Sequence, residues 1–207
     1  MRLPLPAPFL WNDSLKKGCR SRFWDIRLHC SMYTTDPQDE IFPVVNEQGV
    51  VIGRTTRREA HRNRELIHPV IGIFVFDTRE RVLLQKRSAT KDLNPHCWTV
   101  SVGGHIKHGD TPIDTAVREI EEEIGISVNS ERLTLLGTMV TRNEMQSEYW
   151  YVYRYELPAV APLEAHPDEV AELKFVTLAE LARMIHDQKA IWGEDPKKVI
   201  KQFILNE

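Results

Sequence analysis

The chain has 207 residues, which is long enough to bury a sizeable core and fits one domain of ordinary size with some additional elements. Its formal net charge of −3 argues against a general nucleic-acid surface but remains compatible with small anionic ligands. Three cysteines without a C-x-x-C pair suggest neither a disulfide framework nor a zinc site, and no apolar run reaches about 18 residues, so we expect a cytoplasmic protein without a membrane span.

The first 38 residues differ in composition from the rest of the chain. They are rich in proline and carry aromatic residues such as Trp11 and Trp24 without a clear period, so we expect an irregular extension. One interpretation is a leader segment, or a biological start at Met32; the other is an element whose aromatic side chains pack on the domain. The domain itself is expected to cover residues 39–207.

From residue 41 onward, segments rich in β-branched and aromatic residues are separated by turn residues, and segments with helical periodicity begin at threonine caps or prolines. In chain order we expect a hairpin of strands 41–45 and 50–54, a short helix after Thr56, a second hairpin of strands 70–77 and 82–86, a short strand 98–102, a helix 112–125, strands 133–142, 149–157 and 169–176, and helices 178–185 and 196–205. This order predicts an α/β (α+β) fold with a mixed β-sheet sandwiched between α-helices.

Three glutamates of the expected helix 112–125 share one helical face. Positions i, i+3 and i+4 lie together, so Glu119, Glu122 and Glu123 should converge, whereas Arg118 and Glu121 should point elsewhere. Crowded like charges repel each other, and a cation would remove that cost. Oxygen ligands suit Mg²⁺ or Mn²⁺, so the pattern predicts a metal site, with a solvated acidic helix face as the alternative.

The spacing of these residues resembles the Nudix box, G-x5-E-x7-R-E-U-x-E-E-x-G-U, in which U is a bulky aliphatic residue. The matching positions are Gly104, Arg118, Glu119, Ile120, Glu122, Glu123, Gly125 and Ile126. Asp110 stands where the family has a glutamate and is one methylene shorter, so we expect it to support the loop rather than bind the first metal. The resemblance implies the Nudix fold and an enzyme that hydrolyses phosphoanhydrides with Mg²⁺ or Mn²⁺, its metal ligands being Gly104, Glu119, Glu122 and Glu123.

A longer stretch, from Val44 to about Ile185, resembles the isopentenyl-diphosphate isomerase branch of the Nudix superfamily. The similarity includes RSATK at residues 87–91 and WTVSVGGH at residues 98–105. In that isomerase, the residues that match His61, His68, His105 and Glu148 help to bind a divalent metal, which implies a second metal site here. Gln146 falls where the isomerase has a further carboxylate, and Arg87 and Lys91 match basic residues that grip the diphosphate.

Gly103 stands at the position of the isomerase's cysteine. Isomerising an unactivated alkene needs an acid and a base, and glycine has no proton to give. Cys97 lies six residues upstream and is expected to be a small apolar filler rather than a substitute. The sequence therefore favours hydrolysis, with the isomerase reaction and a non-catalytic diphosphate sensor as the alternatives.

The roles of individual residues follow from this chemistry. We favour Glu122 as the base that takes a proton from the attacking water, with Glu148 as the other candidate. Arg87 and Lys91 are candidates for binding the substrate phosphates, although a solvated turn is the alternative. The expected substrate is a nucleoside diphosphate derivative or a related organic diphosphate, and the aromatic residues 149–151 could stack on a base or simply pack. No nucleic acid or membrane partner is expected, and a homodimer is left open.

Overall fold

The computed structural model describes residues 34, 36–158, 162–187 and 190–207. The predicted N-terminal extension falls outside these residues except for Thr34 and residues 36–38. Within that short part Asp36 is only 7% exposed, because its carboxylate pairs with groups of the domain. The boundary at residue 38, and the two interpretations of the segment before it, stay predictions.

The centre of the described chain is a mixed nine-stranded β-sheet. Its middle strand, β3 (Ile67–Phe76), pairs in parallel with β8 (Ser147–Glu156) over its whole length and antiparallel with β6 (Val102–His105). The other strands are β1 (Ile41–Val45), β2 (Val51–Thr56), β4 (Val82–Arg87), β5 (Trp98–Thr99), β7 (Leu133–Arg142) and β9 (Val170–Val176). Side chains alternate between the two faces of a strand, so this buried sheet requires a cover on both faces.

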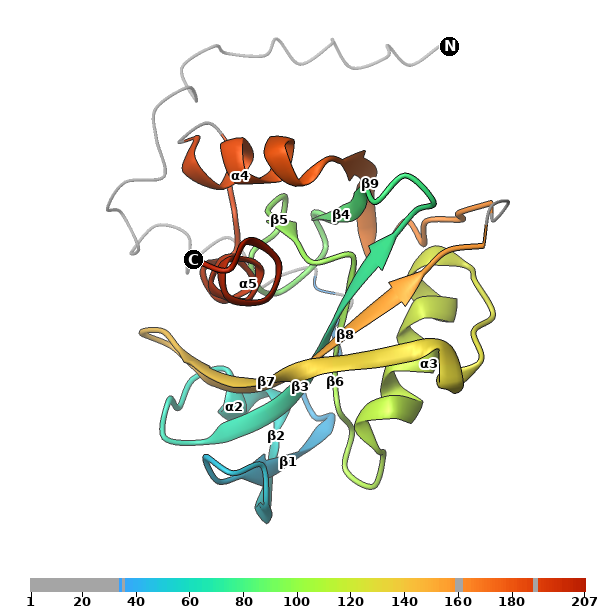
Figure 1. Cartoon of the computed structure of the whole chain (residues 1–207). Helices are drawn as coiled ribbons and strands as arrows, with labels where there is room; N and C mark the ends of the chain where they lie inside the picture. The colour runs from blue at the N-terminus through green and yellow to red at the C-terminus, as the bar shows by residue number, and fades with distance from the viewer. Residues whose placement is uncertain (1–33, 35, 159–161, 188–189) are drawn as a thin grey trace, which may run out of the picture. The chain divides into compact units, whose positions relative to one another are not determined.

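Helices supply that cover from both sides (Figure 1). The helical segments are α2 (Arg57–Ala60), α3 (Pro112–Ile124), the 3-10 turn η2 (Ser130–Arg132), α4 (Leu178–His186), α5 (Glu194–Ile200) and the π-helical turn η3 (Lys201–Leu205). On β3, Ile71 and Ile73 belong to the core that includes α3, while Phe74 and Phe76 belong to the core that includes α4 and α5. The predicted sheet sandwiched between helices is therefore confirmed.

Helix α3 begins and ends at the residues that its sequence predicts. The Thr111 side chain accepts a hydrogen bond from the Asp114 backbone N–H, and Pro112 occupies the first turn. At the other end Gly125 adopts a left-handed conformation with φ of 73°, which favours glycine. These caps fix the register of the helix and hence the face on which its glutamates lie.

Two predictions about strands were wrong in part. The expected strand 98–102 is two strands, β5 beside β4 and β6 beside β3, because the chain crosses between them at Ser101. The buried Ser101 Oγ donates to the Leu83 carbonyl of β4 (2.5 Å) and accepts from the Val75 N–H of β3 (2.8 Å). These two hydrogen bonds connect β3 and β4 at the point where the chain crosses. The expected second hairpin is also short: β3 and β4 pair only at Phe76 and Val82, and β4 pairs mainly with β9.

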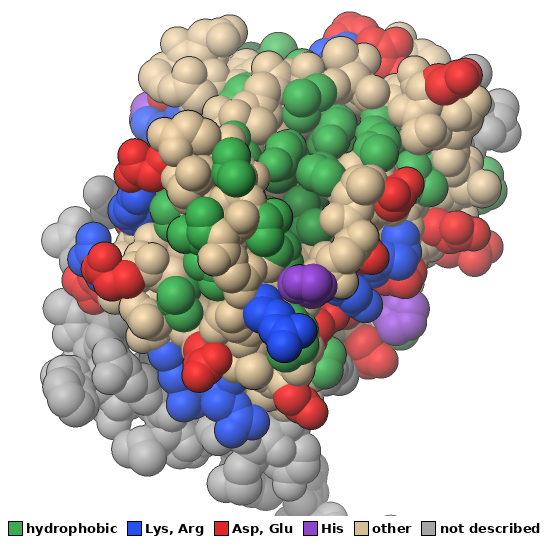
Figure 2. All heavy atoms as spheres, turned by 90° about the horizontal axis from the view of Figure 1, so that it is seen from below, with side chains coloured by type: hydrophobic (Ala, Val, Ile, Leu, Met, Phe, Trp, Pro, Cys, Tyr) green, Lys and Arg blue, Asp and Glu red, His purple; other side chains and the backbone are tan. Residues whose placement is uncertain are grey.

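Some hydrophobic side chains lie on the surface rather than in the core. Val51 and Ile52 on β2, which pairs with β1 at the edge of the described sheet, are exposed, as are Leu135 and Leu136 on β7. Figure 2 shows hydrophobic side chains gathered on the face seen from below, where the β1–β2 hairpin lies. In the part of the chain that the structure describes, no helix is long and apolar enough to cross a membrane. The homodimer left open above stays a prediction.

The crossing at Ser101 generates a stability prediction. Ser101→Ala leaves the buried Val75 N–H and Leu83 carbonyl without this side-chain partner, so it should lower the free energy of unfolding by about 1–3 kcal/mol. Ser130→Ala, at an exposed serine, is the matched control and should change stability by less than about 0.5 kcal/mol. Equal urea midpoints for the two variants would contradict the structural role given to Ser101.

Candidate functional site

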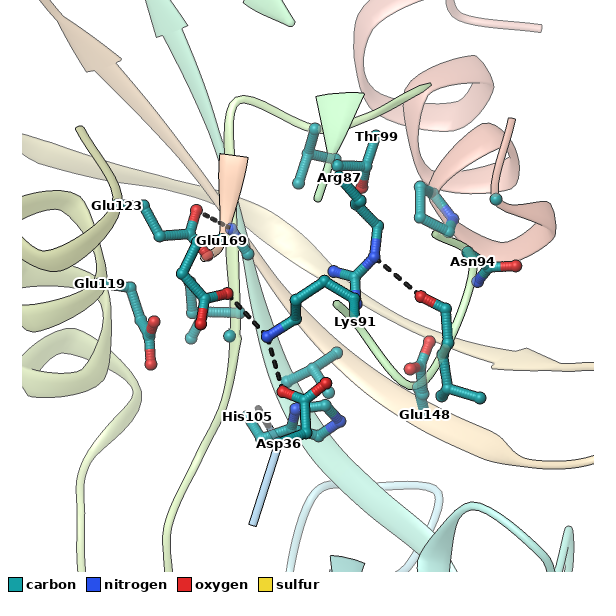
Figure 3. A pocket seen from close by; sticks show the side chains of 18 of the residues that line it. Asp36, Arg87, Lys91, Asn94, Thr99, His105, Glu119, Glu123, Glu148 and Glu169 are labelled. Carbon is teal, nitrogen blue, oxygen red and sulfur yellow. Dashed lines mark hydrogen bonds and ion pairs between the residues drawn. The ribbon is translucent and has the colours of Figure 1, made fainter. Parts of the chain in front are cut away.

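A cavity of about 240 Å³ opens where β6 runs past α3. Its walls come from segments far apart in the sequence, including β3, β4, α3, β8 and the residues before β9. Figure 3 shows Glu119, Glu123 and Glu169 on one side of it, Glu148 and Asn94 on the other, and Arg87 and Lys91 between them. Acidic groups thus line both sides, with two cations in the middle.

The carboxylate of Glu119 lies directly against the backbone of Gly104. A Cβ atom built on Gly104 would overlap the Glu119 side chain, so this approach requires glycine. One residue earlier, the Gly103 N–H donates to Glu123 Oε2 (3.4 Å). Pairing of β6 with β3 fixes the backbone of both glycines, so the strand holds the two inner glutamates of α3 in place.

Burial makes the negative charges of these glutamates unfavourable. It raises the pKa of Glu119 to about 7, with Arg118 opposing the shift and Glu122 and Glu169 adding to it. Burial likewise raises the pKa of Glu123 well above its usual range, and the neighbouring Glu119 and Glu169 add to that shift. A divalent cation would offset both effects, and a set of carboxylate oxygens fits Mg²⁺ or Mn²⁺. Glu122 differs, since its side chain is 56% exposed at the rim.

Arg118 lies on the acidic face of α3 and not away from it, so that prediction was wrong. Its Nη1 contacts Glu119 Oε1 and Glu122 Oε2, each at 2.9 Å. The long side chain bends back over the helix and reaches carboxylates one and four residues later, which a spacing argument based on Cβ direction misses. Arg118 Nη2 also lies 4.0 Å from Asp110 Oδ2, so Arg118 links the acidic face to the preceding loop.

The two basic side chains between the acidic walls use some of their N–H groups in hydrogen bonds within the protein. Lys91 Nζ donates to Asp36 Oδ1 (2.6 Å) and to Glu169 Oε2 (2.7 Å). Arg87 Nε donates to the Leu93 carbonyl (3.0 Å). A lysine ammonium has three donors and a guanidinium has five, so each side chain keeps N–H groups for another acceptor in the cavity.

Three histidines cluster beside the cavity. One ring nitrogen from each of His61, His68 and His105 lies within 4.8 Å of the others, and His61 Nε2 is 3.0 Å from His105 Nε2. Phe42 stacks on His105, with ring centroids 4.6 Å apart. Burial lowers the pKa of all three imidazoles, strongly for His68 and His105, and so favours the neutral form, which is the form that binds metals.

A buried ion-pair network orients the first of these histidines. Asp92 Oδ2 lies 3.6 Å from His61 Nδ1 and accepts from Arg57 Nε (3.0 Å). Although burial opposes it, the contacts with His61 and Arg57 hold the pKa of Asp92 well below its usual range. A carboxylate behind one imidazole nitrogen turns the other nitrogen toward the cluster, as outer partners of metal-binding histidines do.

Sheet register brings Glu148 to the same place. In the parallel β3–β8 pair, His68 is opposite Glu148, and His68 Nε2 lies 4.0 Å from Glu148 Oε1. Neither ring nitrogen of His68 makes a hydrogen bond within the described residues, so the nitrogen that carries no proton can bind a cation. The three histidines and Glu148 therefore fit a second divalent cation. Burial raises the pKa of Glu148 to about 8, and the nearby Asp195 adds to the shift.

A family model described as NUDIX domain matches residues 66–203, two-thirds of the chain. The chain belongs to the Nudix family. The matched range contains α3, which we call the Nudix helix from here on, together with β6 and most of the cavity wall.

Individual Nudix relatives carry two kinds of name. One, from Photorhabdus laumondii subsp. laumondii, is called isopentenyl-diphosphate Delta-isomerase 2 and is 30% identical over 166 residues, covering 78% of this chain and 91% of the relative. Another, an uncharacterised Nudix hydrolase of Nostoc sp., is 33% identical and covers 57% of this chain and 70% of its own. The crystal structure of DR0079 from Deinococcus radiodurans matches with a TM-score of 0.65 at 21% identity, covering 80% of this chain and 99% of that one, which supports the fold.

The structure brings the predicted site residues into one neighbourhood but adds members that the sequence did not indicate. Glu169 and Asp36 hold Lys91, and neither belongs to a local pattern. Glu169 reaches the Nudix helix because β9 pairs with β4, next to Arg87, and this pairing has no signal in residue spacing. Of the aromatic residues 149–151, Trp150 lines the cavity, whereas Tyr149 and Tyr151 pack in the cores on the other side of β8.

The contact between Gly104 and Glu119 generates a binding prediction. Gly104→Ala forces the Glu119 carboxylate off the strand, so Mn²⁺ affinity measured by calorimetry should fall by about 10-fold or more. Gly53→Ala is the matched control, because a Cβ there meets only Val44 Cβ at 3.9 Å. Unchanged Mn²⁺ affinity in Gly104→Ala would remove Glu119 from the metal ligands.

Proposed function

We propose that this Nudix protein hydrolyses a phosphoanhydride bond of a nucleoside diphosphate derivative or a related organic diphosphate, using Mg²⁺ or Mn²⁺. The observation that carries the proposal is the set of glutamates on the Nudix helix, with Glu119 pressed against Gly104 and Glu123 bound to the Gly103 N–H. Their raised pKa values indicate a site that is unfavourable for anions until a cation is bound.

Glu119, Glu122, Glu123 and the Gly104 carbonyl would hold the ion. When bound, Mg²⁺ or Mn²⁺ neutralises charge on the diphosphate and lowers the pKa of a coordinated water. Glu122 is the best candidate for accepting the proton of that water, because it is the most exposed of the three glutamates and Arg118 holds its Oε2 at 2.9 Å. Glu148 remains the other candidate, but burial raises its pKa to about 8, which lowers the fraction of the deprotonated, basic form at neutral pH.

Arg87 and Lys91 would bind the phosphates from between the two acidic walls. Lys91 has two of its donors on Asp36 and Glu169, which fix the ammonium, and its third donor can reach a phosphate oxygen. Among the described residues, the Arg87 side chain donates a hydrogen bond only through Nε, which leaves the ends of the guanidinium for a bidentate contact. The carboxylates of Asp36 and Glu169 neutralise part of the positive charge of Lys91. Binding of the diphosphate would therefore depend on the metal ion as well as on the two basic side chains.

The second candidate function is isomerisation of isopentenyl diphosphate, which the names of several relatives favour. The histidine cluster with Glu148 supports it as a second metal site. Against it stands Gly103, which supplies no acid where the isomerase branch has a cysteine. A non-catalytic diphosphate sensor is a third candidate, and tight binding without product would favour it.

Replacing the proposed base tests the hydrolase. Glu122→Gln keeps the shape of the side chain but removes its charge and basicity, so kcat should fall by roughly 10²-fold or more in a Mg²⁺ assay with nucleoside diphosphate derivatives. Glu121→Gln, one residue earlier and exposed, is the charge-matched control and should keep near-normal turnover. If Glu122→Gln retains full kcat, Glu122 is not the base.

Isopentenyl diphosphate tests the second candidate. Incubation with the protein and Mg²⁺ should give no dimethylallyl diphosphate by mass-resolved product analysis, because Gly103 cannot protonate the alkene. Gly103→Cys fits sterically, since a Cβ there makes only ordinary contacts with Val100 (3.4 Å) and Ile71 (3.6 Å). That substitution alone should still give no product, because Gln146 also departs from the isomerase pattern. Product formation by the unaltered protein would favour the isomerase over the hydrolase.

A further inference from the structure

Gln85 carries a buried amide side chain on β4, only 2% exposed, and it lines the cavity. One side of the amide faces only acceptors and the other side faces only donors, so the nitrogen lies toward the acceptors. In this orientation Nε2 donates to Glu123 Oε2 (3.2 Å) and to the Ser101 carbonyl (3.3 Å). A neutral side chain of the sheet therefore contacts an inner glutamate of the Nudix helix.

Strand pairing fixes the backbone from which Gln85 extends. At this point β4 has a neighbour on each side, so Gln85 lies opposite Thr99 of β5 and Leu173 of β9. The hydrogen bond to Ser101 also connects the amide to the place where the chain crosses from β5 to β6. A side chain with a paired backbone and two acceptors at its end is well placed to orient a neighbouring group.

Both donors to Glu123 meet the same oxygen atom. Oε2 accepts from the Gln85 amide of β4 and from the Gly103 N–H of β6 (3.4 Å). The two contacts fix the carboxylate from two strands, and they leave the second oxygen, Oε1, to bind a cation.

Gln85 differs in charge from the residue that contacts the other glutamates of this helix. Arg118 binds Glu119 and Glu122 through a cation, which neutralises part of their charge. The amide of Gln85 orients Glu123 and leaves its negative charge for a metal. Burial raises the pKa of Glu123 well above its usual range. An N–H group that donates to a carboxylate favours the ionised form, so Gln85 acts in the direction that cation binding needs.

We propose that Gln85 is a positioning residue of the metal site, an inference that rests on the proposed metal-dependent function. Its amide holds Glu123 Oε2, so that Oε1 stays available to a divalent cation. Gln85 acts through Glu123 and not by binding the cation itself. Removing such an outer partner of a metal ligand typically lowers metal affinity by about 10- to 100-fold.

Mg²⁺ binding to the full chain, measured by calorimetry without substrate, tests this role. Mg²⁺ prefers oxygen ligands, so the titration reports on the glutamates rather than on the histidine cluster. Gln85→Met keeps a side chain of similar length but removes the donor, so Mg²⁺ affinity should fall by about 10-fold or more. Gln202→Met, at an exposed glutamine of η3, is the matched control and should keep the affinity within about 2-fold.

The dependence of turnover on Mg²⁺ separates positioning from a purely structural role. In Gln85→Met, the Mg²⁺ concentration that gives half-maximal turnover of a nucleoside diphosphate derivative should rise by about 10-fold or more. At saturating Mg²⁺, kcat should stay within about 3-fold of the unaltered protein, because the filled site contains the same ligands. A distorted active site would instead turn over slowly at every Mg²⁺ concentration.

Nuclear magnetic resonance on the ¹⁵N-labelled, unaltered protein needs no substitution. The side-chain amide protons of Gln85 should exchange slowly with water, because they are buried and donate to Glu123 and Ser101. Adding Mg²⁺ should shift their signals and saturate together with the calorimetric curve, whereas the side-chain signals of Gln202 should stay in place. This measurement decides the question even if Gln85→Met fails to fold.

The outcomes separate the positioning role from the hydrolase. Failure of Mg²⁺ to bind the unaltered protein would count against the proposed function, and the positioning role would fall with it. Equally tight Mg²⁺ binding in Gln85→Met, a kcat that stays low at saturating Mg²⁺, or a Gln85 amide signal that does not respond to Mg²⁺ would overturn the positioning role alone. Weaker Mg²⁺ binding in Gln85→Met without hydrolysis by the unaltered protein would support the positioning role and favour the diphosphate sensor.

Discussion

Repulsion between buried carboxylates is the constraint on which the rest of the site depends. Ile120 and Ile124 must face the core under β3, and this orientation of α3 also turns Glu119 and Glu123 inward. Once there, the two groups have little water to stabilise their charge. The glycines of β6, the guanidinium of Arg118 and the ammonium of Lys91 surround them, yet burial still raises the pKa of both, so the protein leaves part of the compensation to a cation.

Local patterns predicted the parts of the molecule that local forces determine. The bounds of α3 follow from Thr111, Pro112 and Gly125, and the periodicity of its glutamates predicted which carboxylates converge. The same reasoning was wrong for Arg118, because a long side chain can bend onto a face that its Cβ does not point to. It also treated residues 98–102 as one strand, because the crossing at Ser101 depends on hydrogen bonds to Leu83 and Val75, far away in the sequence.

Long-range pairing determines the remainder of the site. Glu169 arrives through the β4–β9 pair and Glu148 through the β3–β8 pair, so neither position could be placed from spacing alone. Buried ion pairs then connect the two halves of the cavity. Asp36 binds both Lys91 and Arg57, while Arg57 binds the Asp92 that stands behind His61. This chain of ion pairs connects the glutamates of the Nudix helix with the histidine cluster.

Parallel pairing of β3 with β8 also ties the site to the order in which the ribosome delivers the chain. His68 cannot meet Glu148 until Ser147–Glu156 has left the exit tunnel, and Glu169 follows later still. Pairings between distant segments close slowly, because loop-closure entropy is lost before the contacts form. A nascent chain therefore carries the Nudix helix with its crowded acidic face some time before the opposite wall exists. A ligand that needs both walls of the cavity would therefore act on the last stage of folding rather than on the first.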